Sequence, residues 1–485
     1  MIPTLTRRSF MATSALAAAS LGLPRGAWAA THKPLLLTAT SRTLDIDGRA
    51  ATVWGLVNAQ GGSGLTLDPG QRFRVDLTNA LDADTIIHWH GQIPPNSQDG
   101  VPDIPRPMLK PGEVREFDFE PMPGTYWMHS HVPVQEMELL AAPLIVRSTA
   151  DVAADRQEVV MFLHDFSFRP AAEVLAEITG GDGSMAGMDM GAATPAHDAT
   201  TGMDMEGKGM SGMAMDLNDF NFDAYLANDR TLNDPEVVVV ENGGRVRLRI
   251  INAAAATVFW IDTGAIAGRL VAVDGHEVQP LPGRRFGLAM GQRLDIELDL
   301  PNGEGAFPVL ALREGAFERT GIILATAGAT IEKLAGTGET AAAAFDADLS
   351  QEAALRAMTP LSDRPADATA ILMLGGSMQP YLWTINGQAW GNHSPITAKS
   401  GQRVELTFHN MSMMAHPMHL HGHTFQVVAL NGKRFAGAMR DTVQVPRMAM
   451  VTVALGAGEA ARWMLHCHHM PHLSTGMMTE FAVST

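Results

Sequence analysis

Eight histidines of this chain form four His-X-His pairs, a spacing that suits metal binding. Alternate residues of a β-strand point to the same face, so both imidazoles of a pair can reach one metal cluster. A single pair is weak evidence, but packing alone does not explain four pairs, because buried rings need polar partners. The pairs are His88 and His90, His129 and His131, His419 and His421, and His466 and His468. Together they predict a metal cluster.

The only cysteine, Cys467, lies between the members of the last pair, so its side chain should point to the opposite face of the strand. With one cysteine, no internal disulfide can form. Together with His416, His472 and Met477, Cys467 supplies two imidazoles, one thiolate and one thioether. This combination is typical of blue-copper sites. One strand would then serve two metal centres, and an electron accepted at the first could leave through the backbone of Cys467.

The segments that carry these residues resemble the four copper signatures of the multicopper oxidases, in the bacterial laccase-like and copper-resistance branch. The segments are "HWHG", "HSH", "HPMHLHGH" and "HCHHMPHLSTGMM". The resemblance implies three cupredoxin domains and four coppers, with a type 1 copper in the third domain and a trinuclear cluster between the first and third. It assigns the type 1 copper to His416, Cys467, His472 and Met477, and the type 2 copper to His88 and His419. The type 3 pair would take His90, His129, His131, His421, His466 and His468.

A pattern that recurs three times organises the chain and positions these pairs. The copies begin at Gly70, Gly243 and Gly401, and each continues into alternating apolar residues, which is typical of a half-buried strand. An asparagine follows at the same offset in every copy, namely Asn79, Asn252 and Asn410. Aligned on these asparagines, the outer copies carry matching histidine pairs, whereas the middle copy has Ile261 and Thr263 instead.

The repeat predicts all-β sandwich domains, and with the resemblance it gives three cupredoxin-like Greek-key β-sandwich domains. We expect domain 1 at residues 30–150, domain 2 at 151–330 and domain 3 at 365–485. Residues 331–364 form the expected linker, with a short helix capped by Ser350. Residues 181–216 hold few large apolar groups other than methionine, which predicts a methionine-rich loop inserted in domain 2.

Charge and the first residues bear on location. The formal net charge of −17 disfavours nucleic acid and anionic lipid as partners and concentrates cations near the surface. Arg7 and Arg8, an apolar run and then Ala27-Trp28-Ala29 are typical of a twin-arginine signal peptide, over residues 1–29. No other apolar stretch reaches the length of a membrane span. We expect a periplasmic protein without a membrane span; its oligomeric state stays open.

Reduction of dioxygen to water consumes protons, so a carboxylate is expected near the cluster. Asp99 resembles the acidic residue that relatives keep beside the type 2 site, although an Asp-Gly turn is the alternative. Some relatives place a glutamate directly after the type 1 histidine, where this chain has Leu473, so a second proton route is in doubt. The expected catalytic residues are Asp99, Cys467 and His472. Four other histidines are expected to be hydrogen-bonding groups rather than ligands: His164, His276, His423 and His469.

The expected activity is one-electron oxidation of donors at the His472 edge, coupled to reduction of dioxygen to water. The donor is Cu(I) or a phenolic or similar organic molecule. The methionines of residues 181–216 favour Cu(I), because thioethers are soft ligands, although a solvated loop without this role is the alternative. Met411, Met413 and Met414 either extend that copper path or pack the strand. The alternative function is a periplasmic copper-binding or storage protein without turnover, which would leave the paired histidines unexplained.

Overall fold

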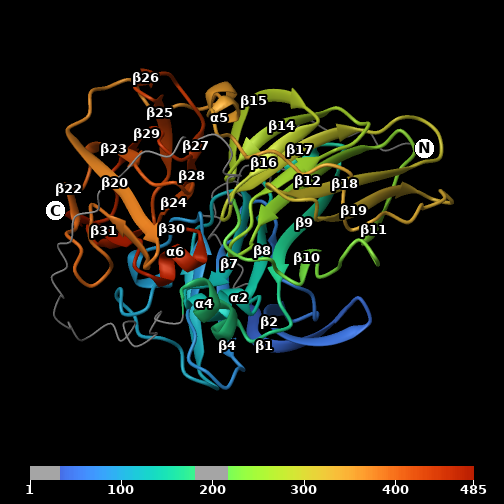
Figure 1. The fold of residues 1–485 in the computed structure, drawn as a ribbon, viewed down its shortest axis with the longest axis horizontal. Coiled ribbons are helices and arrows are strands. Elements are labelled where there is room, and N and C mark those ends of the chain that lie inside the picture. Colours follow the sequence, from blue (N-terminus) through green and yellow to red (C-terminus); the bar gives the residue numbers. More distant parts are fainter. Residues whose placement is uncertain (1–32, 181–216) are drawn as a thin grey trace, which may run out of the picture. The chain divides into compact units, whose positions relative to one another are not determined.

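The strands of the described part of the chain form six sheets, which follow one another in three pairs (Figure 1). The computed structural model describes residues 33–180 and 217–485, and Leu35–Thr485 pack as one unit. In Figure 1 the three pairs run from blue to cyan, from green to yellow, and from orange to red. The predicted signal peptide at residues 1–29 and the predicted methionine-rich insert at 181–216 lie outside the described residues.

The first pair of sheets encloses a core that includes Phe73, Trp89 and Phe117. The order of one sheet is β2-β1-β4-β6, with bounds β2 (Arg49–Asn58), β1 (Leu35–Ile46), β4 (Phe73–Asn79) and β6 (Val114–Phe119). The order of the other is β3-β8-β7-β5, with bounds β3 (Leu65–Leu67), β8 (Ala141–Val146), β7 (Gly124–Ser130) and β5 (Ile87–His90).

The second pair encloses the core that includes Leu248, Phe259 and Phe286. One sheet has the order β10 (Ala224–Ala227), β9 (Gln157–Phe166), β12 (Arg245–Asn252), β17 (Arg293–Asp299), β14 (Gly268–Val273) and β15 (His276–Gly283). The other has the order β11 (Val237–Val240), β19 (Arg319–Thr326), β18 (Ala306–Arg313), β13 (Phe259–Asp262) and β16 (Arg285–Leu288).

The third pair encloses the core that includes Phe408, Trp463 and Cys467. One sheet has the order β21 (Tyr381–Ile385), β20 (Ala368–Met378), β23 (Arg403–Asn410), β29 (Met450–Gly456), β25 (Phe425–Leu430) and β26 (Lys433–Arg434), and β27 (Met439–Arg440) also pairs with β25. The other has the order β22 (Ile396–Lys399), β31 (Met478–Ser484), β30 (Arg462–Cys467), β24 (His416–Leu420) and β28 (Thr442–Val445). The predicted all-β fold is confirmed, and the domain boundaries and the linker stay predictions.

In the first and the third pair of sheets, the strand register places one His-X-His pair opposite the other. β5 and β7 are antiparallel and pair His88 with His129, while β24 and β30 pair His419 with His466. Residues opposite each other on neighbouring antiparallel strands lie close enough for their side chains to interact. In the middle pair, β13 and β18 place Ile261 opposite Ala311. The same topology therefore presents imidazoles in the outer pairs and apolar side chains in the middle pair.

The recurrent asparagines explain why the pattern repeats, because each ties down the loop that follows its strand. Nδ2 of Asn79 donates to the carbonyls of Ala83 and Leu109. Nδ2 of Asn252 donates to the carbonyls of Thr257 and Leu288, and its Oδ1 accepts from the amide of Ala254. Asn410 makes the same kind of contacts in the third pair, to Met414, Val445, Pro446 and Ser412.

The few helices are short and lie in connections: η1 (Asn96–Gln98), α2 (Pro133–Met137), α3 (Thr149–Ala153), α4 (Ala171–Ile178), α5 (Ser350–Ala354) and α6 (Met470–Ser474). The predicted cap at Ser350 is wrong, because Ser350 is the first helical residue and Leu349 precedes it without a side-chain cap. The carboxylate of Asp346 instead accepts from the amides of Gln351 and Glu352. A charged acceptor that satisfies two free amides replaces the predicted hydroxyl cap.

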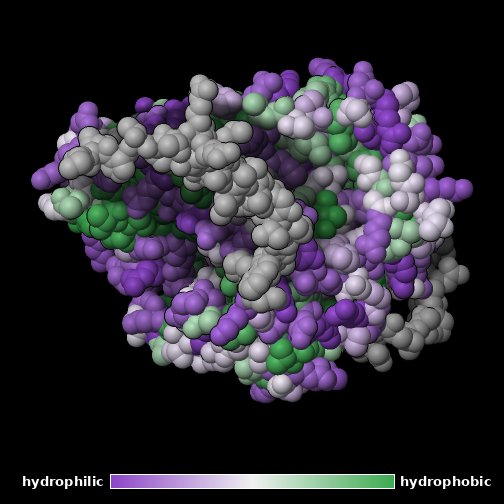
Figure 2. All heavy atoms as spheres, turned by 180° about the vertical axis from the view of Figure 1, so that it is seen from behind, coloured by the Kyte–Doolittle hydropathy of each residue, from purple (hydrophilic) through white to green (hydrophobic). Residues whose placement is uncertain are grey.

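The surface is mainly polar on the face shown in Figure 2, where hydrophobic residues gather only in small groups. Among the described residues, the structure contains no helix that combines the length and the apolar character needed to cross a membrane.

We expect replacement of Asn252 by alanine to lower the free energy of unfolding by about 2–4 kcal/mol, because two buried carbonyls and one amide lose their partner. Denaturant unfolding measures this loss. The control is Asn242→Ala, whose Oδ1 accepts one exposed hydrogen bond from Gly303 and whose loss should cost less than about 1 kcal/mol. Equal losses of stability in the two variants would contradict the conclusion that Asn252 holds the loop after its strand in place.

Candidate metal centres

The predicted blue-copper residues meet in the third pair of sheets. His416 begins β24, Cys467 ends β30 and His472 lies in α6. Sγ of Cys467 lies 3.7 Å from Nδ1 of His416 and 3.6 Å from Nδ1 of His472, and the two ring nitrogens are 3.1 Å apart. All three side chains are fully buried. One ion could therefore be held by a thiolate and two imidazoles.

Backbone contacts hold Met477 beside this group. The amide of Cys467 donates to the carbonyl of Met477, and the amide of Met477 donates to the carbonyl of His472. Met477 is fully buried in the same core cluster as Cys467. Burial raises the pKa of the Cys467 thiol well above its usual range. A bound metal ion would stabilise the thiolate, because cysteine binds metals in its deprotonated form.

The eight paired histidines converge between the first and third pairs of sheets. Nε2 of His88 lies 3.4 Å from Nε2 of His419, and the rings of His88 and His421 stack with centroids 3.8 Å apart. Within the third pair, Nε2 of His421 lies 3.1 Å from Nε2 of His466. All eight side chains are buried, and His131 is the most exposed at 8%.

Hydrogen bonds hold the outer nitrogens of four rings and leave the inner ones facing the cluster. Nδ1 donates to a backbone carbonyl in each of four cases: His88 to Asp99, His129 to Ser130, His419 to Asp441 and His466 to Cys467. Such partners set the tautomer and orientation of metal-binding imidazoles. Among the described residues, four of the eight rings have a buried nitrogen without a hydrogen-bond partner: Nδ1 of His90, Nε2 of His129, Nε2 of His131 and both nitrogens of His468.

The protonation of the rings also fits a metal cluster. Burial lowers the pKa of His88, His421 and His466 well below its usual value, so these imidazoles are neutral and offer a lone pair. An unpaired buried nitrogen costs free energy unless something satisfies it. Coordination of metal ions at the centre of the cluster would satisfy these nitrogens, so the residues present fit a metal cluster.

Asp99 lies directly beside this cluster, after η1. Its Oδ2 accepts a hydrogen bond of 2.8 Å from Nδ1 of His421, and its Oδ1 lies 3.5 Å from Nδ1 of His88. Burial raises the pKa of Asp99 to about 8. Asp99 thus lies beside both His88 and His421, and its role near a type 2 copper stays a prediction.

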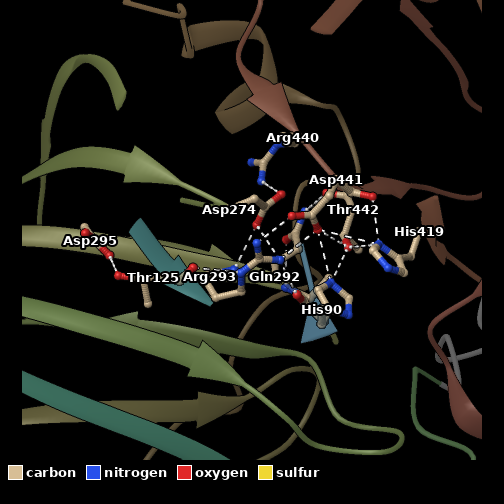
Figure 3. Close-up of polar contacts among 12 residues, drawn as sticks. His90, Thr125, Asp274, Gln292, Arg293, Asp295, His419, Arg440, Asp441 and Thr442 are labelled. Carbon is tan, nitrogen blue, oxygen red and sulfur yellow. Dashed lines mark hydrogen bonds and ion pairs between the residues drawn. The ribbon is translucent and has the colours of Figure 1, made fainter. Parts of the chain in front are cut away.

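Several residues near the centres were not predicted from the sequence. Asp441 and Thr442 contact His90 and His419, and Arg293 from the middle pair of sheets binds Asp441 (Figure 3). Neither Arg293 nor the neighbours Asp441 and Thr442 recur at a spacing that signals a role. Two further buried carboxylates are Glu136, whose Oε2 is 2.9 Å from Nδ1 of His129, and Asp219, whose Oδ2 is 3.7 Å from Nε2 of His472.

The remaining histidines differ in their surroundings. His423 is a hydrogen-bonding group, as predicted: Nδ1 donates to the carbonyl of His421 and Nε2 accepts from the amide of Gly458. His469 stacks on His472 with ring centroids 3.9 Å apart. His164 packs against Phe162. The prediction that His164, His276 and His469 are not ligands stays untested.

Comparison with known proteins identifies the family. Family models described as multicopper oxidase match residues 38–151, 193–329 and 363–485. The multicopper oxidase MmcO of Mycobacterium tuberculosis is 31% identical, over 96% of this chain and 90% of that protein. The chain belongs to the multicopper oxidase family. The copper resistance protein A of Escherichia coli is 24% identical, over 85% of this chain and 86% of that protein.

A solved structure agrees with this assignment at the level of the fold. The multicopper oxidase from Pseudomonas thermotolerans aligns with a TM-score of 0.68 at 23% identity, over 93% of this chain and 99% of that chain. The three pairs of sheets are thus cupredoxin-like sandwiches. As a multicopper oxidase, the chain is a copper-binding oxidoreductase that uses dioxygen and a reductant.

We expect the copper-loaded Cys467→Ser variant to lose its intense visible absorption and to bind one copper fewer per chain, because the thiolate is gone while the histidine cluster keeps its ligands. Visible spectra and metal analysis measure both effects. The control is Ser130→Ala at the equivalent position of the first pair, whose hydroxyl contacts Gln135 and which should keep the absorption. An unchanged spectrum in Cys467→Ser would contradict the assignment.

Proposed function

We propose that this multicopper oxidase oxidises Cu(I), and phenolic or similar organic donors, in one-electron steps and reduces dioxygen to water with four coppers per chain. In this proposal His416, Cys467, His472 and Met477 hold the type 1 copper. His88 and His419 hold the type 2 copper. The type 3 pair is held by the six remaining paired histidines: His90, His129, His131, His421, His466 and His468.

One observation carries the proposal: three consecutive residues, 466–468, contribute side chains to both candidate centres. Sγ of Cys467 faces His416 and His472, while the rings of its neighbours His466 and His468 lie in the histidine cluster. One peptide unit on each side of Cys467 therefore connects the two candidate centres covalently. When bound, copper supplies the one-electron redox chemistry and dioxygen binding that side chains lack.

Asp99 is proposed to hold a proton for dioxygen reduction. Burial raises the pKa of Asp99 to about 8, so the protonated carboxyl is populated at neutral pH. Oδ2 accepts from His421, whereas Oδ1 has no hydrogen-bond partner in the described part of the chain and can carry the proton. Leu473 cannot supply a second route, and Glu136 is a buried carboxylate beside two other rings of the cluster, His129 and His468.

The surroundings of His472 favour a cationic donor. Asp219 lines a cleft of about 630 Å³, and its Oδ2 lies 3.7 Å from Nε2 of His472. The hydroxyl of Tyr381 donates to the same oxygen. His472 is fully buried, and the Asp219 side chain, itself 1% exposed, contacts the ring and lines the cleft. A buried carboxylate between solvent and a type 1 ligand attracts cations such as Cu(I).

A role in copper tolerance follows from this donor and is supported by the name of the related copper resistance protein A. The proposed periplasmic location and twin-arginine export rest on residues 1–29 of the sequence alone. Residues 181–216, with their methionines, are proposed to capture Cu(I) and deliver it to the cleft, because Leu217 and Asn218, which directly follow them, line the cleft together with Asp219.

The Asp219→Asn variant should lower kcat/KM for Cu(I) roughly 10-fold and that for a neutral phenol much less, because a charge that attracts cations is removed. Oxygen uptake with each donor measures this difference. Asp68→Asn is the control, since it removes the same charge from an exposed side chain of the first pair of sheets. Equal losses for both donors in Asp219→Asn would contradict a cation site.

Deletion of residues 185–215 should reduce oxygen uptake with Cu(I) and leave uptake with a phenol unchanged, if the methionines deliver the metal. The same assay compares the intact and shortened chains. Equal Cu(I) rates in the two chains would contradict the delivery role. Full copper binding without oxygen uptake from either donor would instead support the alternative of a copper-storage protein.

A further inference from the structure

The middle pair of sheets has no ligand pairs, yet its loop between β16 and β17 reaches the histidine cluster. Gly291 lies in this loop with a φ of +78°. A Cβ at Gly291 would lie 2.8 Å from Cδ2 of His468 and 3.2 Å from Cε1 of His90. Only glycine lets the backbone approach the rings this closely. The loop is therefore part of the wall of the cluster.

Arg293, two residues further on, binds Asp441 through both arms of its guanidinium. One arm donates to Oδ1 at 2.7 Å and the other donates to Oδ2. Nε of Arg293 donates at 3.1 Å to the carbonyl of Thr125 in β7. Both Arg293 and Asp441 are fully buried. A bidentate pair of this kind fixes both the position and the rotation of the carboxylate.

Asp441 and Thr442 in turn contact two rings of the cluster (Figure 3). Nε2 of His90 lies 3.1 Å from Oδ1 of Asp441 and 3.0 Å from Oγ1 of Thr442. Nδ1 of His419 donates at 2.9 Å to the carbonyl of Asp441. Nε2 of Gln292 donates to the carbonyl of Thr442 at 3.1 Å, which holds this segment from the other side. His90 thus turns its Nδ1, and His419 its Nε2, toward the cluster.

Arg293 also contacts a second group of buried charged residues, on the side away from the cluster's rings. Its amide donates to Oδ1 of Asp274, and the guanidinium of Arg440 donates to Oδ2 of the same carboxylate and to Glu352. Glu352 comes from α5, Arg440 from the third pair of sheets and Asp274 from the second. Arg293 therefore cannot rotate away from Asp441 without leaving buried charges unpaired.

We propose that Arg293 is a positioning residue for the trinuclear centre, acting through Asp441 on His90 and His419. This inference rests on the proposed copper sites. It assigns a function to the middle domain, which contributes no ligand of its own but sets which nitrogen two ligands present to the metal.

The test uses the copper-loaded full chain with Arg293→Met. The affinity for type 2 copper should fall about 10-fold, the low end of the loss that follows removal of a direct partner of a metal ligand, because Arg293 acts through Asp441. The type 2 electron paramagnetic resonance signal should weaken or change its hyperfine splitting, while the blue type 1 absorption stays. Arg293→Lys, which keeps the charge but not the bidentate geometry, should fall between Arg293→Met and the unmodified chain.

Arg249→Met is the matched control, because Arg249 is equally buried, lies in the same pair of sheets and also contacts Thr125. Its charged partners are Asp295, Glu158 and Asp151, and none of them touches a ring of the cluster. We expect it to lower the melting temperature without changing the type 2 signal. A similar change of that signal in Arg249→Met would show that general destabilisation, and not positioning, is responsible.

A double variant, Arg293→Met with Asp441→Asn, leaves no unpaired buried charge and covers the case in which Arg293→Met does not fold. It should fold and still show the altered type 2 signal. An unmodified signal and affinity in either variant overturns the inference. If the proposed copper sites themselves are wrong, the result differs from these outcomes, because the unmodified chain would then lack the blue absorption or the type 2 signal.

Discussion

The alternation of side chains along one extended segment is the constraint on which the two centres depend. Cys467 points into the core of the third sandwich, where it meets His416 and His472. Its neighbours His466 and His468 point to the other side, where they meet the histidines of the first sandwich. A change of register by one residue would exchange the two sides. The antiparallel pairing of β30 with β24 and β31 therefore sets the chemistry as well as the fold.

The cluster also makes the association of the outer sandwiches obligatory for metal binding. Neither sandwich holds the complete set of rings, and rings of the two meet where His88 stacks on His421 and His90 stacks on His419. The buried neutral rings carry unpaired nitrogens, which are costly without a metal ion. We infer that metal binding and packing of the sandwiches stabilise each other. The middle sandwich contacts the third sandwich through buried charged pairs, among them Arg293 with Asp441.

Much of this arrangement was predictable from the sequence, for a physical reason. Strands have a short period, so alternating apolar residues after Gly70, Gly243 and Gly401 predicted the central strands, whose inner residues are buried. The recurrent asparagines marked equivalent loops, and the His-X-His spacing placed both rings of a pair on one side. The approach of the pairs across two sandwiches followed from the repeat together with the family resemblance.

The residues near the centres that were not predicted show no local pattern in the sequence. Asp441, Arg293 and Asp219 reach their partners across long distances in the sequence, and a single charged residue leaves no periodic pattern. The incorrect cap at Ser350 has a local origin instead: Leu349 adopts a left-handed conformation directly before the helix, and the acceptor is Asp346, five residues before Gln351. Tertiary contacts decide the surroundings of Asp441, Arg293 and Asp219, whereas local patterns decide the strands.

Anomalous scattering at the copper edge from crystals of the copper-loaded chain tests the central claim most directly. The account predicts four copper peaks per chain. One should lie within bonding distance of Cys467, His416 and His472, and three should lie among the paired histidines on the opposite side of residues 466–468. A copper bound jointly by Cys467 and either His466 or His468, or an absence of copper from one of the two sides, would contradict it.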